Sequence, residues 1–276
     1  MQKQLIFMKK QNKHPLVSVI MNCRNGERYL IKSVKSVIQQ TYKNWELIFF
    51  DNCSTDKSKK IIKSFTDKRI KYFNSKKFLN LYDARNLAIR KSKGRYVSFL
   101  DTDDLWTKDK LQQQVYFLKK NKGVKILFSN YFILEENKNK NTIKHRKNLP
   151  SGNITQKLLD NYSIGILTVF IEKNIFKKFK FKKNYNIIGD FDFFIKLSRK
   201  FRIFSIQKPL AFYRIHDSNL SSTNIKVFIK ELDEWIKKNN KKLNNLGFSL
   251  DKQKFYLKKL KLKFFINKSL GRVVQW

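Results

Sequence analysis

Two aspartates stand two positions apart directly after a short apolar run. Asp101 and Asp103 follow Tyr96-Val97-Ser98-Phe99-Leu100, which has the pattern of a strand buried on both faces. Oxygen ligands select hard cations, and Mg²⁺ is commonly shared between one or two carboxylates and substrate phosphates. The motif predicts a Mg²⁺ or Mn²⁺ site with Asp103 and Asp101 as ligands. The alternative is a solvated turn in which Asp104 or Thr107 caps the next helix.

Two further polar clusters follow two other predicted strands. The segment 22–25 comes after the apolar run 17–21, and 51–56 comes after 45–50. In a parallel α/β sheet, ligands bind outside the carboxyl ends of the strands, so the three clusters should converge in one crevice. The 51–56 cluster, taken alone, is equally compatible with helix capping.

The first 130 residues alternate between strand-like and helix-like segments. We expect strands at 17–21, 45–50, 70–73, 95–100 and 125–131, separated by helices at 27–40, from the cap at 54–56 through Phe65, at 79–92 and at 107–121. This alternation predicts an α/β fold with a Rossmann-like, mostly parallel central sheet. The later part is less regular, with an exposed connection at 135–148, helices at 154–162 and 190–200, and strands at 165–171 and 202–206.

The pattern divides the chain into three parts. We expect an N-terminal extension at 1–14, a main domain at 15–222 with a regular first part (15–132) and a less regular second part (133–222), and a basic helical C-terminal segment at 223–276. In the last part, aromatic side chains lie among many lysines. That pattern fits an amphipathic helix on an anionic membrane, and it fits a helix packed on the main domain equally well.

The formal net charge is +40, which is typical of proteins that bind nucleic acid. The lysines are spread along the whole chain, however, and the joint excess of Lys, Asn, Ile and Phe indicates an AT-rich genome, so a nucleic-acid partner is disfavoured. Contact with an anionic membrane, at about 1 kcal/mol per well-placed Lys or Arg, remains open. No signal peptide or spanning run is present, and the two cysteines fit a reducing compartment. We expect a cytoplasmic protein, peripheral on the inner face of the plasma membrane if it binds lipid.

The polar clusters belong to a longer, correctly ordered set of segments. The set comprises 17–25, 36–48, Asp51-Asn52-Cys53-Ser54-Thr55-Asp56, Ala84-Arg85-Asn86 and 94–104. Together they resemble the family 2 glycosyltransferases of the GT-A fold, from Val17 to about Ser221. The resemblance implies an inverting transfer of a sugar from a nucleoside-diphosphate sugar, with UDP favoured, to a hydroxyl of a glycan or lipid-linked acceptor in bacterial surface-glycan synthesis.

The resemblance also implies that 15–222 is a catalytic domain with a donor half (15–132) and an acceptor half (133–222), and it implies roles for residues of the donor half. Asp51 and Asn52 would hold the nucleoside, with further donor contacts from Asn22, Arg24 and Asp101. Asn52 replaces the second Asp of the commonest pair, and Arg24 stands where an aromatic ring often stacks on the base. The planar guanidinium group of Arg85 would contact the diphosphate. The alternative for Arg85 is a surface arginine.

The resemblance places the general base and one more candidate ligand in the acceptor half. Asp190, within Ile188-Gly189-Asp190-Phe191-Asp192, would take the proton of the acceptor hydroxyl. The alternative for Asp190 is an acid that stabilises a helix N-terminus, the role we expect for Asp192. His216, in the segment 213–221, would touch the metal or the diphosphate, or only order its loop.

Two other functions remain open at the sequence level. A nucleotidyltransferase also places carboxylates at strand ends, but it should carry a Gly-rich phosphate loop after the first strand. Here the segment 22–26 has a single glycine. The other alternative is a non-enzymatic basic protein that binds nucleic acid or membrane.

Overall fold

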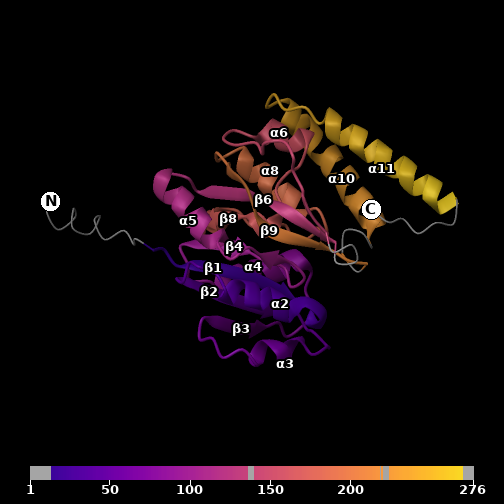
Figure 1. The fold of residues 1–276 in the computed structure, drawn as a ribbon. Helices are drawn as coiled ribbons and strands as arrows, with labels where there is room; N and C mark the ends of the chain where they lie inside the picture. The colour runs from indigo at the N-terminus through magenta and orange to yellow at the C-terminus, as the bar shows by residue number, and fades with distance from the viewer. Residues whose placement is uncertain (1–13, 136–139, 218, 220–223, 270–276) are drawn as a thin grey trace.

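A nine-stranded sheet forms the centre of the molecule (Figure 1). The structure, a computed structural model, describes residues 14–135, 140–217, 219 and 224–269, so nearly all of the predicted N-terminal extension lies outside it. The strands are β1 (Val17–Cys23), β2 (Trp45–Asp51), β3 (Ile70–Asn74), β4 (Tyr96–Phe99), β5 (Leu105–Trp106), β6 (Ile126–Glu135), β7 (Lys140–Ile143), β8 (Phe170–Glu172) and β9 (Phe204–Ile215). Their order is β3-β2-β1-β4-β8-β6-β9-β5, and β7 pairs with β6.

The first four strands are parallel, as the sequence predicts. Every residue of β2 and β4 is buried, which explains their continuous apolar runs. Cys23 at the end of β1 lies opposite Asp51 at the end of β2, and Ile20 of β1 lies opposite Phe99 of β4. The register therefore brings the three polar clusters to one edge of the sheet.

The second part of the sheet is mixed and departs from the predicted elements. β8 lies antiparallel between β4 and β6, after a single 3-10 turn η2 (Ile166–Thr168), where the pattern predicted one strand over 165–171. The segment 135–148, predicted as an exposed connection, includes the hairpin strand β7. β9 is much longer than the predicted strand at 202–206. It continues through Pro209 because the ladder with β6 shifts register beside that proline, whose missing N–H is tolerated at such an irregularity.

The helices are α2 (Glu27–Ile38), α3 (Ser58–Lys63), α4 (Leu81–Lys91), α5 (Lys110–Lys120), α6 (Thr155–Asp160), α7 (Ile175–Lys178), α8 (Gly189–Ser198), α10 (Ile225–Asn244) and α11 (Asp251–Ser269). Helix α5 begins three residues later than predicted, with Asp109 at its N-cap position. The capping alternative for Asp104 and Thr107 is therefore wrong. Asp104 is a buried residue in front of β5 instead.

The C-terminal helices α10 and α11 pack on the catalytic domain next to α6 and α8 (Figure 1). Their buried side chains, among them Leu232, Trp235, Leu257 and Leu260, belong to the same hydrophobic cluster as Phe99 of β4. Of the two arrangements expected for the C-terminal segment, the structure shows the one in which its helices pack on the rest of the protein. Within the described residues, no helix combines the length and the apolar character needed to cross a membrane. The three-part division of the chain stays a prediction.

Candidate active site

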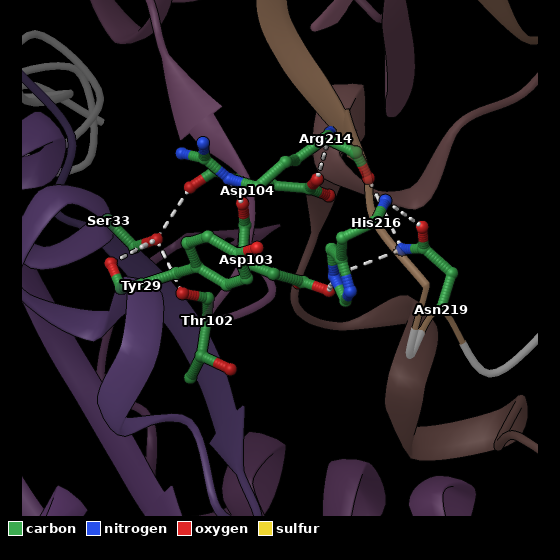
Figure 2. A network of polar contacts seen from close by, with 8 residues as sticks. All are labelled: Tyr29, Ser33, Thr102, Asp103, Asp104, Arg214, His216 and Asn219. Atoms are coloured by element: carbon green, nitrogen blue, oxygen red, sulfur yellow. Dashed lines mark hydrogen bonds and ion pairs between the residues drawn. The ribbon is translucent and has the colours of Figure 1, made fainter. Parts of the chain in front are cut away.

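The loop between β4 and β5 carries Asp101, Asp103 and Asp104, and it is held from two sides (Figure 2). From β9, the backbone N–H of Arg214 donates to the buried carboxylate of Asp104 at 3.0 Å, and Arg214 Nε donates to the carbonyl oxygen of Asp103 at 2.7 Å. From α2, the Ser33 hydroxyl lies 2.6 Å from the carbonyl oxygen of Thr102 and 2.7 Å from that of Asp104. The loop geometry is therefore fixed by protein contacts before any ligand binds.

Asp103 and His216 form the candidate cation site. Asp103 Oδ2 and His216 Nε2 lie 2.9 Å apart, although 113 positions separate the two residues in the sequence. Asn219 accepts the backbone N–H of His216 at 2.7 Å, and the ring of Tyr29 lies 5.1 Å from the imidazole (Figure 2). Among the described residues no three Asp, Glu, His or Cys side chains cluster as a complete metal site.

Arg85 of α4 joins this loop to the candidate base. Its Nη1 donates to Asp190 Oδ1 at 2.6 Å, and its Nη2 donates to Asp101 Oδ1 at 3.4 Å. The side chain is only 2% exposed, and its guanidinium lies within 5.6 Å of the rings of Tyr82 and Phe99. A buried guanidinium requires anionic partners, and here both partners are candidate functional carboxylates. The alternative that Arg85 is an exposed surface arginine is therefore wrong.

Burial shifts both carboxylates toward the neutral form. It raises the pKa of Asp101 to about 6, with Arg85 acting in the opposite direction and the charges of Asp103 and Asp190 adding to the rise. Burial also raises the pKa of Asp190, again opposed by Arg85. A carboxylate with a raised pKa is a better proton acceptor once it is ionised, which is the property needed in a general base.

Tyr82, which sequence reasoning missed, contacts the segment of the candidate base Asp190 from α4. Its hydroxyl donates to the carbonyl oxygen of Ile187 at 2.6 Å and accepts the backbone N–H of Asp190 at 3.3 Å. The Tyr82 ring also explains Gly189, because a Cβ atom at that position would lie 2.4 Å from the ring. Only glycine allows the chain to pass this close to the tyrosine.

Glu231, also missed from the sequence, holds the same segment from α10. Its carboxylate is buried and accepts three consecutive backbone N–H groups, from Asn186 at 2.6 Å, Ile187 at 3.0 Å and Ile188 at 3.1 Å. The available sequence signal was weak, because Glu231 is one of three acidic residues just before Trp235, together with Asp233 and Glu234. The C-terminal segment therefore contributes directly to the geometry around the base.

Asp192 lies on the α10 side of helix α8. Its carboxylate accepts Trp235 Nε1–H at 3.0 Å and pairs with Lys196 one turn later. This placement agrees with the structural role expected for it and leaves Asp190 as the acid that faces Arg85. The two acidic residues of one helical turn thus serve different neighbours.

Asp51 and Asn52 lie at the end of β2 and are buried. Asp51 accepts the backbone N–H of Ser54 at 2.9 Å and the hydroxyl of Tyr72 at 3.0 Å. The Asn52 amide pairs with the backbone of Leu79, accepting its N–H at 3.0 Å and donating to its carbonyl at 2.7 Å. Asn52 therefore fixes the loop before α4, so any help it gives to donor binding acts through that loop.

Arg24 has an aromatic partner that the sequence did not reveal. Its guanidinium lies 4.1 Å from the ring centre of Phe78, whose side chain is 60% exposed in the loop fixed by Asn52. An aromatic ring therefore reaches this end of the crevice from another segment. Close by on β1, the side-chain nitrogen of Asn22 is buried and has no hydrogen-bond partner in the described part of the chain.

Residues 18–200 match the family model described as "Glycosyl transferase family 2". The chain belongs to this family. It is 32% identical over 220 residues to UDP-Glc:alpha-D-GlcNAc-diphosphoundecaprenol beta-1,3-glucosyltransferase WfgD of Escherichia coli, covering 79% of this chain and 84% of that one. It is 31% identical over 218 residues to the putative teichuronic acid biosynthesis glycosyltransferase TuaG of Bacillus subtilis, covering 78% and 85%.

Solved structures with the same fold include TarS 1-349 of S. aureus, with a TM-score of 0.63 at 18% identity over 80% of this chain and 65% of that one. The mannosyltransferase PcManGT from Pyrobaculum calidifontis, solved with GDP-Man and Mn²⁺, gives a TM-score of 0.61 at 14% identity over 86% and 70%. The predicted GT-A fold is confirmed. Family membership makes the protein a glycosyltransferase, so the nucleotidyltransferase and the non-enzymatic alternatives are set aside.

Proposed function

We propose that this glycosyltransferase transfers a sugar, with inversion, from a UDP-sugar to a hydroxyl of a lipid-linked glycan, with Asp190 as general base. The observation that supports this most directly is the arrangement Asp190–Arg85–Asp101. The buried guanidinium of Arg85 lies 2.6 Å from the carboxylate of Asp190, the candidate base, and 3.4 Å from the carboxylate of Asp101. A base and a leaving-group site held this close suit a single in-line displacement, because positioning removes much of the entropic barrier.

In the proposed reaction, the acceptor oxygen forms a bond to the anomeric carbon as the bond to the diphosphate oxygen breaks. The acceptor proton passes to Asp190, and the nucleoside diphosphate leaves. Burial raises the pKa of Asp190 and so favours proton uptake, while Arg85 keeps the carboxylate ionised and oriented before the reaction. Arg85 also carries a positive charge 3.4 Å from Asp101, where it can offset charge that develops on the leaving group.

Asp103, His216 and Asp101 are the residues that would hold a Mg²⁺ or Mn²⁺ ion. When bound, the cation would neutralise charge on the departing diphosphate. The pairing of Asp103 with His216 at 2.9 Å supports this assignment, since a carboxylate and an imidazole already converge at the crevice. The Mn²⁺ in the PcManGT complex supports it by analogy of fold alone.

The donor nucleotide would lie at the ends of β1 and β2. Asp51 offers a hydrogen-bond acceptor for the nucleoside, and Asn22 offers a buried amide N–H that has no partner among the described residues. The guanidinium of Arg24 and the ring of Phe78 together offer a surface on which the nucleobase can stack. The name of the E. coli relative specifies a UDP-Glc donor and a diphosphoundecaprenol-linked acceptor. A lipid-linked acceptor of that chemistry would place this enzyme at the cytoplasmic face of the membrane.

A donor screen tests the proposal. Thermal unfolding should be measured with Mn²⁺ and, in turn, UDP-, GDP- and dTDP-sugars at equal concentration. A UDP-sugar at 100 times its Kd should stabilise the fold by about 2.7 kcal/mol, and the other nucleotides should stabilise it less. A shift with GDP- or dTDP-sugars alone would overturn the nucleotide assignment. A screen without any shift would contradict the donor site as a whole.

A further inference from the structure

Asp190 also lines a cavity of about 500 Å³ that the reaction above leaves unassigned. The other walls are mostly apolar and come from the segment after α6 (Tyr162), from α8 (Phe191), from α10 (Phe228, Leu232) and from α11 (Tyr256). The volume lies within the range of small-molecule sites, which are typically apolar with a few polar groups that orient the ligand. The cavity therefore begins at the candidate base and extends under the C-terminal helices.

Tyr162 supplies a second polar group next to Asp190. Its hydroxyl is buried and has no hydrogen-bond partner among the described residues, and its ring packs edge-on against Phe191 at 5.3 Å. Burial, with a smaller contribution from the charge of Asp190, raises the pKa of Tyr162 well above its ordinary value, so the hydroxyl stays a donor. A buried hydroxyl without a partner is destabilising, and a ligand hydroxyl at this position would supply the missing hydrogen bond.

A second cavity of about 350 Å³ adjoins the first. The two share Phe228 and Tyr256, whose rings meet edge to face at 6.4 Å. The walls of the second cavity are again mainly apolar and include Leu260 of α11. Further along this helix, large apolar side chains are exposed among lysines, namely Leu262, Phe265 and Ile266. Both cavities are thus walled mainly by apolar side chains, and α11 presents further exposed apolar side chains beyond them.

We propose that the two cavities form one acceptor groove, with the acceptor sugar at Asp190 and Tyr162 and an isoprenoid chain across Phe228 and Tyr256 toward the end of α11. The inference rests on the proposed function, because it assumes a lipid-linked acceptor. Apolar walls match the chain, and the lysines of α11 match the negative charge of the diphosphate that joins chain to sugar. A water-soluble glycan would leave most of this apolar surface unused.

Calorimetric titration with farnesyl diphosphate tests the groove, with the same proteins titrated separately with UDP. Tyr256→Glu puts a carboxylate at the junction of the two cavities, and Phe255→Glu is the matched control, since Phe255 neighbours Tyr256 but lines neither cavity. The two side chains are 46% and 57% exposed, so both variants should fold. We expect Tyr256→Glu to weaken farnesyl diphosphate binding at least tenfold, Phe255→Glu to change it less than twofold, and both to bind UDP like the wild type.

A photoreactive farnesyl diphosphate gives a readout that needs no mutation. It should label peptides that contain 160–164 or 225–232. The groove is overturned if Tyr256→Glu binds the probe unchanged, if Phe255→Glu loses binding equally, or if wild-type protein that binds UDP prefers inorganic diphosphate to the farnesyl compound. Failure of UDP and UDP-sugars to bind would instead contradict the proposed function itself.

Discussion

The donor half and the acceptor half build their parts of the site in different ways. In the proposed donor half, the candidate side chains follow the ends of adjacent parallel strands, so the sheet register brings Asp51 and the Asp101–Asp103 loop to one edge. Arg214 and Ser33 then fix the loop there. In the acceptor half, Asp190 begins a helix whose leading segment is held by Tyr82 from α4 and by Glu231 from α10. The donor half is therefore brought together mainly by sheet register, and the acceptor half mainly by a few long-range side-chain contacts.

This difference separates binding from chemistry. The donor site depends on the core of the sheet, and single surface changes should leave it in place. The base depends on hydrogen bonds that individual substitutions can remove. We therefore expect changes near Asp190 to alter turnover much more than donor affinity, whereas changes around Arg24 should do the reverse.

Replacing Asp190 with Asn should have the largest effect. The amide keeps the shape of the side chain but cannot take the acceptor proton, so kcat should fall about 10²–10⁴-fold. The Kd for UDP should stay within about threefold of the wild type, because the UDP contacts proposed here lie at the other strand ends. Turnover is measured by UDP release, and the exposed Asp251→Asn is the control. Wild-type turnover in Asp190→Asn would move the base elsewhere.

Asp103→Ala should come next and tests the donor half. It removes the carboxylate paired with His216, so metal-dependent turnover should fall on the order of a hundredfold, which corresponds to about 2.7 kcal/mol of lost charge stabilisation. The fold should persist, since Arg214 binds the backbone carbonyl of residue 103 and not its side chain. The residual rate should not respond to EDTA. Full activity of this variant in excess EDTA would contradict the cation site.

Glu231→Gln tests whether the C-terminal segment positions the base. The amide loses the charge and turns an NH₂ group toward backbone N–H donors, so the segment 186–188 should loosen. Hydrogen bonds to a charged group contribute about 1.5–3 kcal/mol, which predicts a loss in kcat of roughly tenfold or more. Donor Kd should be unchanged, and the exposed Glu234→Gln on the same helix should behave like the wild type. Equal losses in donor binding and turnover would indicate general unfolding instead.

The contrast between the halves also explains how far sequence reasoning reached. Parallel strands buried on both faces give mainly apolar runs with polar ends, so β1 to β4 and the meeting of their polar ends at one sheet edge were predictable. β8 has only three residues, and β9 contains a proline, so neither strand shows a clear alternation of apolar and polar residues. Tyr82 and Glu231 act on Ile187 and Ile188 across 105 and 43 positions of the chain. No local pattern encodes such contacts, and only the family resemblance pointed to Asp190.

The pH dependence of turnover should report the base. Asp190 works as the carboxylate, so kcat should fall tenfold per pH unit below its pKa in the complex. Burial raises that pKa. The fall in kcat on the acid side of the pH profile, the acid limb, should therefore have its midpoint above the pKa of about 3.9 of an exposed aspartate. The limb should disappear from the residual activity of Asp190→Asn. A limb that stays in place in this variant would belong to another group of the site.

Phe78→Ala should give the smallest effect, and it should act on donor affinity alone. Phe78 stacks with Arg24 at an exposed position, where such contacts contribute about 0.5–1 kcal/mol, so UDP should bind about two- to fivefold more weakly with kcat unchanged. Tyr116→Ala, another exposed aromatic far from the crevice in sequence, is the control. Because the ring and the guanidinium form one surface, Arg24→Ala should add little in the double variant, and calorimetry of the four proteins measures this coupling. Additive losses would mean that the two side chains contact the nucleotide independently.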